Sequence, residues 1–146
     1  MRKNMFYTML ILLLLLVGVN LLAATKSAAS CIEGRYKLPN ELEIEIYLLE
    51  GKYVGKIVAL NNFNEGQIND VKNPDKSERK KPLLGKIIIE GLTYDATAEH
   101  WTHGTMYAPE MGMKVNLKVN SVNENEAVAE GSKFLFHKTV HWKKVK

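Results

Sequence analysis

The fold is decided by the stretch Glu41-Leu42-Glu43-Ile44-Glu45-Ile46-Tyr47-Leu48, residues 41–48, in which charged and aliphatic side chains alternate almost without interruption. Successive side chains of an extended strand point to opposite faces, so the aliphatic residues share one face and the glutamates share the other. One face is therefore expected in a core and the other in water. Glu50-Gly51 follows, and because glycine readily takes positive φ, Lys52–Leu60 is expected to fold back as a hairpin partner.

The same period of two recurs farther along the chain. Residues 113–120 alternate as regularly, and Met113, Val115, Leu117 and Val119 are expected to point inward. Further strands are expected over residues 32–36, 83–90, 92–101, 127–130, 134–136 and 140–143, with a turn at Gly91 and a loop over residues 103–112.

Residues 31–146 show no sustained helical period. We therefore predict an all-β domain, a single small antiparallel barrel of about eight strands with a lipocalin-like form. Closure into a barrel is favoured over an open sheet because it removes exposed strand edges. A barrel of this size holds packed side chains or one small ligand.

The N-terminus has the pattern of a secretory signal. Arg2 and Lys3 precede an uncharged run whose apolar centre is residues 9–19, and small residues follow. Cleavage is expected near Ser30, with an earlier site around Ala24 or an uncleaved membrane anchor as alternatives. The predicted organisation is a signal helix over residues 1–30 and a barrel domain over residues 31–146, exported to the periplasm or cell envelope of a bacterium.

The charge of the chain bears on nucleic-acid binding, and its cysteine content bears on disulfides and lipid modification. The chain has 20 basic and 16 acidic residues, and removal of Arg2, Lys3 and Lys26 leaves 17 against 16. A net charge near +1 is not typical of a nucleic-acid-binding protein. Cys31 is the only cysteine, so no intramolecular disulfide is possible. It follows Ala28-Ala29-Ser30, and is either a lipid-modified cysteine, as in a bacterial lipoprotein, or an unmodified thiol.

Residues 61–81 interrupt the strands with turn formers and charges. Asp70, Asn73 and Asp75 carry three oxygen-bearing side chains in six positions, but the spacing lacks the glycine and distal glutamate of a calcium loop. We interpret them as a turn in which Asn73 bonds its own backbone and the aspartates pair with Lys72, Arg79 or Lys80. Arg79 could instead recognise an acidic group of a ligand. No metal or other cofactor is predicted.

Several short segments, taken in order, resemble a bacterial family known as domain of unknown function 2147. These segments are Asp70, Asn73-Pro74-Asp75, Arg79, Pro82-Leu83-Leu84-Gly85, Trp101, Gly104, Tyr107-x-Pro109, Gly112 and Trp142. The resemblance covers almost all of the chain after the signal segment. It implies secretion and a β-barrel, and it implies no activity.

The chain carries no nucleophile elbow, zinc-protease motif or phosphate-binding glycine loop. Our leading hypothesis is therefore a non-enzymatic envelope protein whose barrel binds a small apolar or amphipathic molecule. The site is expected where residues 61–81 and 101–112 frame a barrel end, with contacts from Asp70, Asn73, Asp75, Arg79, Trp101 and Tyr107. The alternative is an envelope protein-interaction module that uses the same two loops. A membrane contact is expected only through the signal segment or a lipid on Cys31.

Overall fold

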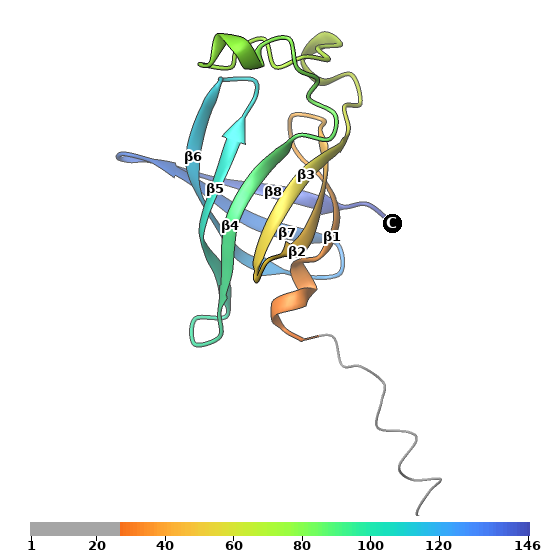
Figure 1. The fold of residues 1–146 in the computed structure, drawn as a ribbon. Helices are drawn as coiled ribbons and strands as arrows, with labels where there is room; N and C mark the ends of the chain where they lie inside the picture. Colours follow the sequence, from red (N-terminus) through yellow and green to blue (C-terminus); the bar gives the residue numbers. More distant parts are fainter. Residues whose placement is uncertain (1–26) are drawn as a thin grey trace, which may run out of the picture.

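The computed structural model describes residues 27–146, so the predicted signal segment lies outside the described residues except for positions 27–30. Eight antiparallel strands form one closed barrel in chain order (Figure 1). They are β1 (Gly34–Lys37), β2 (Glu43–Leu49), β3 (Lys52–Ala59), β4 (Ile87–Asp95), β5 (His100–Ala108), β6 (Met113–Val122), β7 (Glu126–Lys133) and β8 (Phe136–Lys144). The predicted all-β barrel is confirmed. Within residues 27–146 no helix has the length and hydropathy that crossing a bilayer requires.

The alternation in sequence becomes the two faces of the barrel wall. Leu42, Ile44 and Ile46 are buried, as are Leu117 and Val119 of β6, whereas Leu48, expected on the same inward face, is 52% exposed near the end of β2. The barrel closes where β1 pairs with β8, at Tyr36 opposite Lys144 and Lys37 opposite Lys143. Closure thus depends on residues more than 100 positions apart.

The turn expected at Gly91 is wrong. Strand β4 runs through this glycine, and the chain turns only over residues 96–99. Gly91 has a φ of +77° and lies in a bulge, where β4 uses one residue more than β3 between the pairs Tyr53–Leu92 and Gly55–Ile89. A glycine with positive φ serves a bulge as well as a turn, and the local sequence does not distinguish them.

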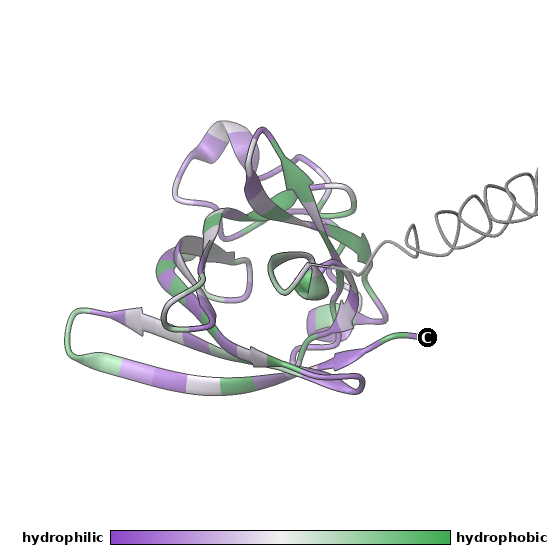
Figure 2. Cartoon of the chain, turned by 90° about the horizontal axis from the view of Figure 1, so that it is seen from below, coloured by the Kyte–Doolittle hydropathy of each residue, from purple (hydrophilic) through white to green (hydrophobic). Residues whose placement is uncertain are grey.

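Two other expected boundaries are wrong as well. Residues 103–108 belong to β5, so only residues 109–112 connect it to β6. Residues 134–136 are not a separate strand, because Phe134 and Leu135 form the two-residue connection between β7 and β8. These two strands make one long hairpin that projects sideways from the barrel and carries an apolar tip (Figures 1 and 2).

One end of the barrel is closed by η1, a single helical turn over Ala29–Ile32. Seen from below in Figure 2, this turn lies inside the ring of strands. Ile32 is fully buried, and its carbonyl accepts a hydrogen bond of 2.8 Å from the Tyr36 hydroxyl. The carbonyl of Ala29 accepts one of 3.0 Å from Trp101 Nε1. The packed domain therefore begins before Cys31.

The long connection between β3 and β4 is ordered and lies over the other end of the barrel (Figure 1). Two backbone hydrogen bonds join its arms, Asp70 N to Lys81 O at 3.0 Å and Leu83 N to Ile68 O at 2.9 Å. The short helices η2 (Phe63–Glu65) and η3 (Lys76–Glu78) lie within it. Phe63 and Leu83 anchor the connection because both are buried in the core.

Candidate functional site

A cavity of about 880 Å³ opens into the barrel on the side of β5 to β8. Its floor includes Leu38, Leu117 and Trp142, which are almost fully buried. The Trp142 ring packs edge-on against Tyr36, with the ring centroids 6.3 Å apart. The floor is thus apolar and rigidly packed, while the upper part of the cavity is open to solvent.

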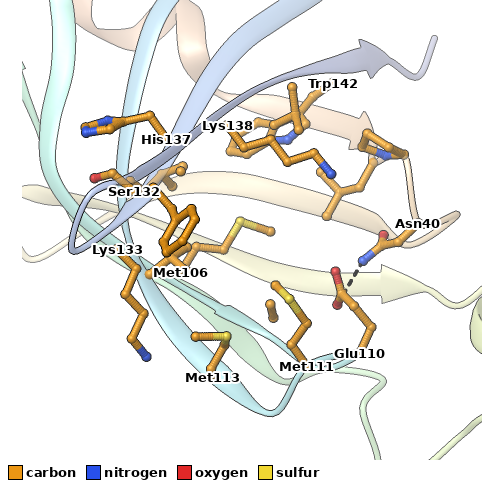
Figure 3. A pocket seen from close by; sticks show the side chains of 18 of the residues that line it. Asn40, Met106, Glu110, Met111, Met113, Ser132, Lys133, His137, Lys138 and Trp142 are labelled. Atoms are coloured by element: carbon orange, nitrogen blue, oxygen red, sulfur yellow. Dashed lines mark hydrogen bonds between the residues drawn. The ribbon is translucent and has the colours of Figure 1, made fainter.

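Three methionines, Met106, Met111 and Met113, line one wall of the cavity (Figure 3). Methionine is unbranched and polarizable, so it adapts to irregular shapes. On another wall, Gly131 leaves space that a side chain would fill. A Cβ added to Gly131 would lie 3.6 Å from Val115 Cγ2, which is ordinary van der Waals contact. Apart from its two chain neighbours, no other side chain of residues 27–146 lies within 4 Å of that Cβ, and Gly131 itself lines the cavity, so a longer side chain at this position would extend into it.

The rim of the cavity is polar. Lys133 at the end of β7 and Lys138 on β8 line one side. Asn40 and Glu110 line another, where Asn40 Nδ2 donates to Glu110 Oε2 at 3.3 Å (Figure 3). The arrangement separates an apolar interior from a charged mouth, as an amphipathic ligand would require.

A second, smaller hollow of about 310 Å³ lies on the outer face of the barrel, beside the exposed ion pair of Lys114 and Glu90. Asn73 and Tyr107 contribute to its lining. Close to it, Asp70 has no solvent-exposed surface and receives three partners. Lys86 Nζ lies 2.8 Å from its Oδ2, Asn73 Nδ2 donates to the same oxygen at 2.7 Å, and the Tyr107 hydroxyl donates to Oδ1 at 2.6 Å.

The partners determine the protonation of this cluster. Burial by itself would raise the pKa of Asp70, but the hydrogen bonds from Lys86, Tyr107 and Asn73 outweigh it and hold the pKa below its usual value. Burial, together with the hydrogen bond to Asp70, raises the pKa of the Tyr107 hydroxyl. Asp70 is therefore a carboxylate at neutral pH and Tyr107 a hydrogen-bond donor. The cluster ties the long connection to β5.

Asn73 was predicted to form a turn by bonding its own backbone, and this is confirmed. Its Oδ1 accepts a hydrogen bond of 2.9 Å from the backbone N–H of Asp75. The expected pairs of the aspartates are wrong. Asp70 pairs with Lys86, and Asp75 caps η3 by accepting from Ser77 N at 2.9 Å. Arg79 Nε donates to the carbonyl of Asn73 at 2.7 Å and so braces the loop.

Trp101 and Tyr107 do not frame one opening. Both lie on β5, six residues apart, which corresponds to about 20 Å at roughly 3.3 Å per residue. Trp101 packs at the closed end beneath η1, with its ring 5.0 Å from that of Tyr94, whereas Tyr107 belongs to the Asp70 cluster. The large cavity is lined by none of the six residues predicted as a ligand or partner surface. That residues 61–81 form a surface for a partner protein stays a prediction.

The residues that line the cavity gave weak signals in the sequence. Met106, Met111 and Met113 are the only methionines after residue 30, and this clustering is the one sequence signal that could have indicated the cavity wall. The run Phe134-Leu135-Phe136 was assigned to a strand although it is too short to alternate. Within residues 27–146 no group of three or more His, Cys, Asp or Glu side chains lies close enough to hold a metal ion.

Comparisons with known proteins agree with this architecture. A search of curated proteins finds no match. Among solved structures, protein HP1028 from the human pathogen Helicobacter pylori, described as belonging to the lipocalin family, superposes with a TM-score of 0.68 at 18% sequence identity, covering 79% of this chain and 83% of that chain. This likeness concerns the fold. Residues 34–144 match the model of a family described as an uncharacterized protein conserved in bacteria (DUF2147). Because the match extends from the first strand of the barrel to the last, the chain belongs to the DUF2147 family.

Proposed function

We propose that this protein is a non-enzymatic binding protein of the bacterial envelope that holds one small amphipathic molecule in the cavity beside β5 to β8. The observation that carries the proposal is the cavity of about 880 Å³, whose size lies within the range of roughly 300–1,000 Å³ typical of small-molecule sites. The fold supports it, since eight-stranded barrels such as lipocalins enclose a volume suited to one small ligand.

The chemistry of the walls indicates the orientation and class of the molecule. Its apolar part would lie against Leu117 and Trp142, and its polar end would lie at the mouth beside Lys133 and Lys138. Two ammonium groups favour an anionic head group, because charge-assisted hydrogen bonds to carboxylate or phosphate are stronger than neutral ones. A long-chain fatty acid is therefore a suitable first probe.

The two tryptophans make the site directly testable, because they lie at different places in the barrel. Trp142 lines the cavity, and Trp101 lies beneath η1 at the closed end. In a Trp101→Phe variant, added dibromostearate should quench the remaining Trp142 fluorescence in a saturable manner. In a Trp142→Phe variant the same titration should leave Trp101 almost unquenched. Equal quenching of both would contradict binding in this cavity.

Filling the cavity should abolish binding without unfolding the protein. Gly131→Leu places a side chain in the space beside Val115, and we expect the affinity for the fatty-acid probe to fall at least tenfold. Gly131→Ala is the matched control, since its methyl group fits at ordinary contact distance and should change the affinity less than threefold. Melting temperatures of both variants establish that the fold is retained. A Gly131→Leu protein that binds as the wild type does would overturn the proposed site.

A further inference from the structure

The β7–β8 hairpin ends in three consecutive apolar side chains that lie almost entirely in solvent. Phe134 is 89% exposed, Leu135 is 93% exposed and Phe136 is 81% exposed. Single exposed apolar residues are normal on protein surfaces, but a contiguous group of large ones marks an interaction site. The tip projects away from the barrel, so the rest of the described chain does not cover it (Figure 2).

The local sequence of this turn is also unfavourable for folding. Lys133 pairs with Phe136, which leaves Phe134 and Leu135 as a two-residue connection. Phe134 takes a φ of +53°, a conformation that hairpin turns normally assign to Gly or Asn. The β2–β3 hairpin shares this feature at its first turn position, where Glu50 has a φ of +50°, but its second position is Gly51, with a φ of +79°, where the β7–β8 turn has Leu135. Departures from local preference are concentrated at functional sites, because selection retains them for another reason.

The charges beside the tip identify the partner. Residues 131–139 contain two lysines, Lys133 and Lys138, and no carboxylate, and the next carboxylate along the hairpin, Glu130, lies 3.3 Å from His137 Nδ1. Lysine side chains can extend along apolar surface and place their ammonium groups among anionic lipid head groups while neighbouring aromatic side chains enter the acyl region. The combination of an apolar tip and a basic collar fits the surface of an anionic membrane.

We propose that the tip Phe134-Leu135-Phe136 docks the barrel on the surface of a lipid bilayer that contains anionic lipids. Phe134, Phe136, Lys133 and Lys138 also line the mouth of the cavity. Docking by this hairpin therefore turns the mouth toward the lipids. The docking itself is independent of ligand binding, whereas transfer of a lipid-derived molecule into the cavity rests on the proposed function.

The test uses tryptophan reporters in the full chain. In Phe134→Trp the added tryptophan lies at the tip, and in Leu48→Trp it lies at the closed end, where Leu48 is 52% exposed. Each is titrated with vesicles of phosphatidylcholine and phosphatidylglycerol that carry brominated acyl chains, and its spectrum is compared with that of the unsubstituted protein. We expect a blue shift and quenching for the tip reporter only. Because η1 and the start of the described chain lie at the closed end, attachment through the N-terminal apolar segment would quench the Leu48→Trp reporter, whereas docking by the tip quenches the Phe134→Trp reporter.

Binding strength provides the second measurement. Replacing all three tip residues with serine should weaken sedimentation with anionic vesicles more than tenfold, whereas Leu48→Ser with Leu49→Ser should have little effect. Lys133→Gln and Lys138→Gln should each weaken binding by about fivefold, the factor that corresponds to one lysine near an anionic surface, and neither should alter binding to neutral vesicles.

Several results would overturn the docking. Equal quenching of the two reporters, or none, contradicts insertion of the tip. A concentration-dependent dimer that the serine variant abolishes, without vesicle binding, assigns the tip to a second copy of the chain. Failure of the proposed function is distinguishable, because Gly131→Leu should lose the fatty-acid probe and retain vesicle binding. Leu135→Ser changes the one tip residue that does not line the cavity, so it should weaken vesicle binding and retain the probe.

Discussion

At the scale of single residues, the buried carboxylate of Asp70 is the contact on which the long connection depends. Lys86→Met removes its only cationic partner among residues 27–146 and leaves a charge without exposed surface. Uncompensated buried charges are strongly destabilising, so we expect the free energy of unfolding to fall by about 3 kcal/mol. Lys114→Met, which breaks the exposed pair with Glu90, is the control and should cost less than about 1 kcal/mol. Urea denaturation at pH 7 measures both.

The stability that the Asp70–Lys86 pair contributes depends on pH. The folded-state pKa of Asp70 is lowered, so its contribution to stability is complete above the pKa of the unfolded chain, about 4. That contribution is lost as the pH falls through the lower folded-state pKa. The stability difference between wild type and Asp70→Asn should therefore be constant from pH 5 to pH 7 and shrink below about pH 4. A difference that persists unchanged at pH 2 would contradict this assignment.

At the scale of elements, the turn between β5 and β6 is locked against the long connection at Gly112. A Cβ at Gly112 would overlap the carbonyl oxygen of Lys72, and the residue has a φ of +64°. Gly112→Ala is therefore expected to destabilise the protein by about 3 kcal/mol, from backbone strain and displacement of the connection. Gly51→Ala isolates the backbone effect, because it has a φ of +79° and open space around it, and should cost about 1 kcal/mol. Thermal unfolding measures the loss of stability in both variants. Equal losses in Gly112→Ala and Gly51→Ala would show that the contact with Lys72 is unimportant.

At the scale of the whole molecule, the packing of η1 predicts where the mature chain begins. Cleavage before Cys31 would remove Ala29 and the carbonyl that Trp101 bonds. We therefore propose the earlier site, around Ala24, so that η1 stays intact and Cys31 is internal and carries no lipid. Intact-mass measurement of the protein purified from the cell envelope, with N-terminal sequencing, tests this. A mature chain that starts at Cys31 with an attached diacylglycerol would contradict it.

The elements that were predicted correctly are those whose structure is determined by residues close together in the sequence. The strands around Ile44 and Leu117 were predicted correctly because their alternation is complete over seven or more residues. The turn at Gly91 and the strand at 134–136 were mispredicted, since a glycine or a short apolar run is compatible with several local structures. The six proposed site residues were predicted from their clustering on residues 61–81 and 101–112, which were expected to frame one end of the barrel. The structure divides them between a structural cluster, a loop and the closed end of the barrel.

The sequence by itself determined the all-β class, the approximate number of strands, the inward face of each regular strand and the family. These follow from a period of two and from segments a few residues long, which are properties of the chain before it folds. Only the tertiary structure decided where the cavity lies, that Asp70 pairs with Lys86, and that the tip at Leu135 remains uncovered. Each of these depends on strand register and barrel closure, which bring together residues far apart in the chain and leave others without neighbours.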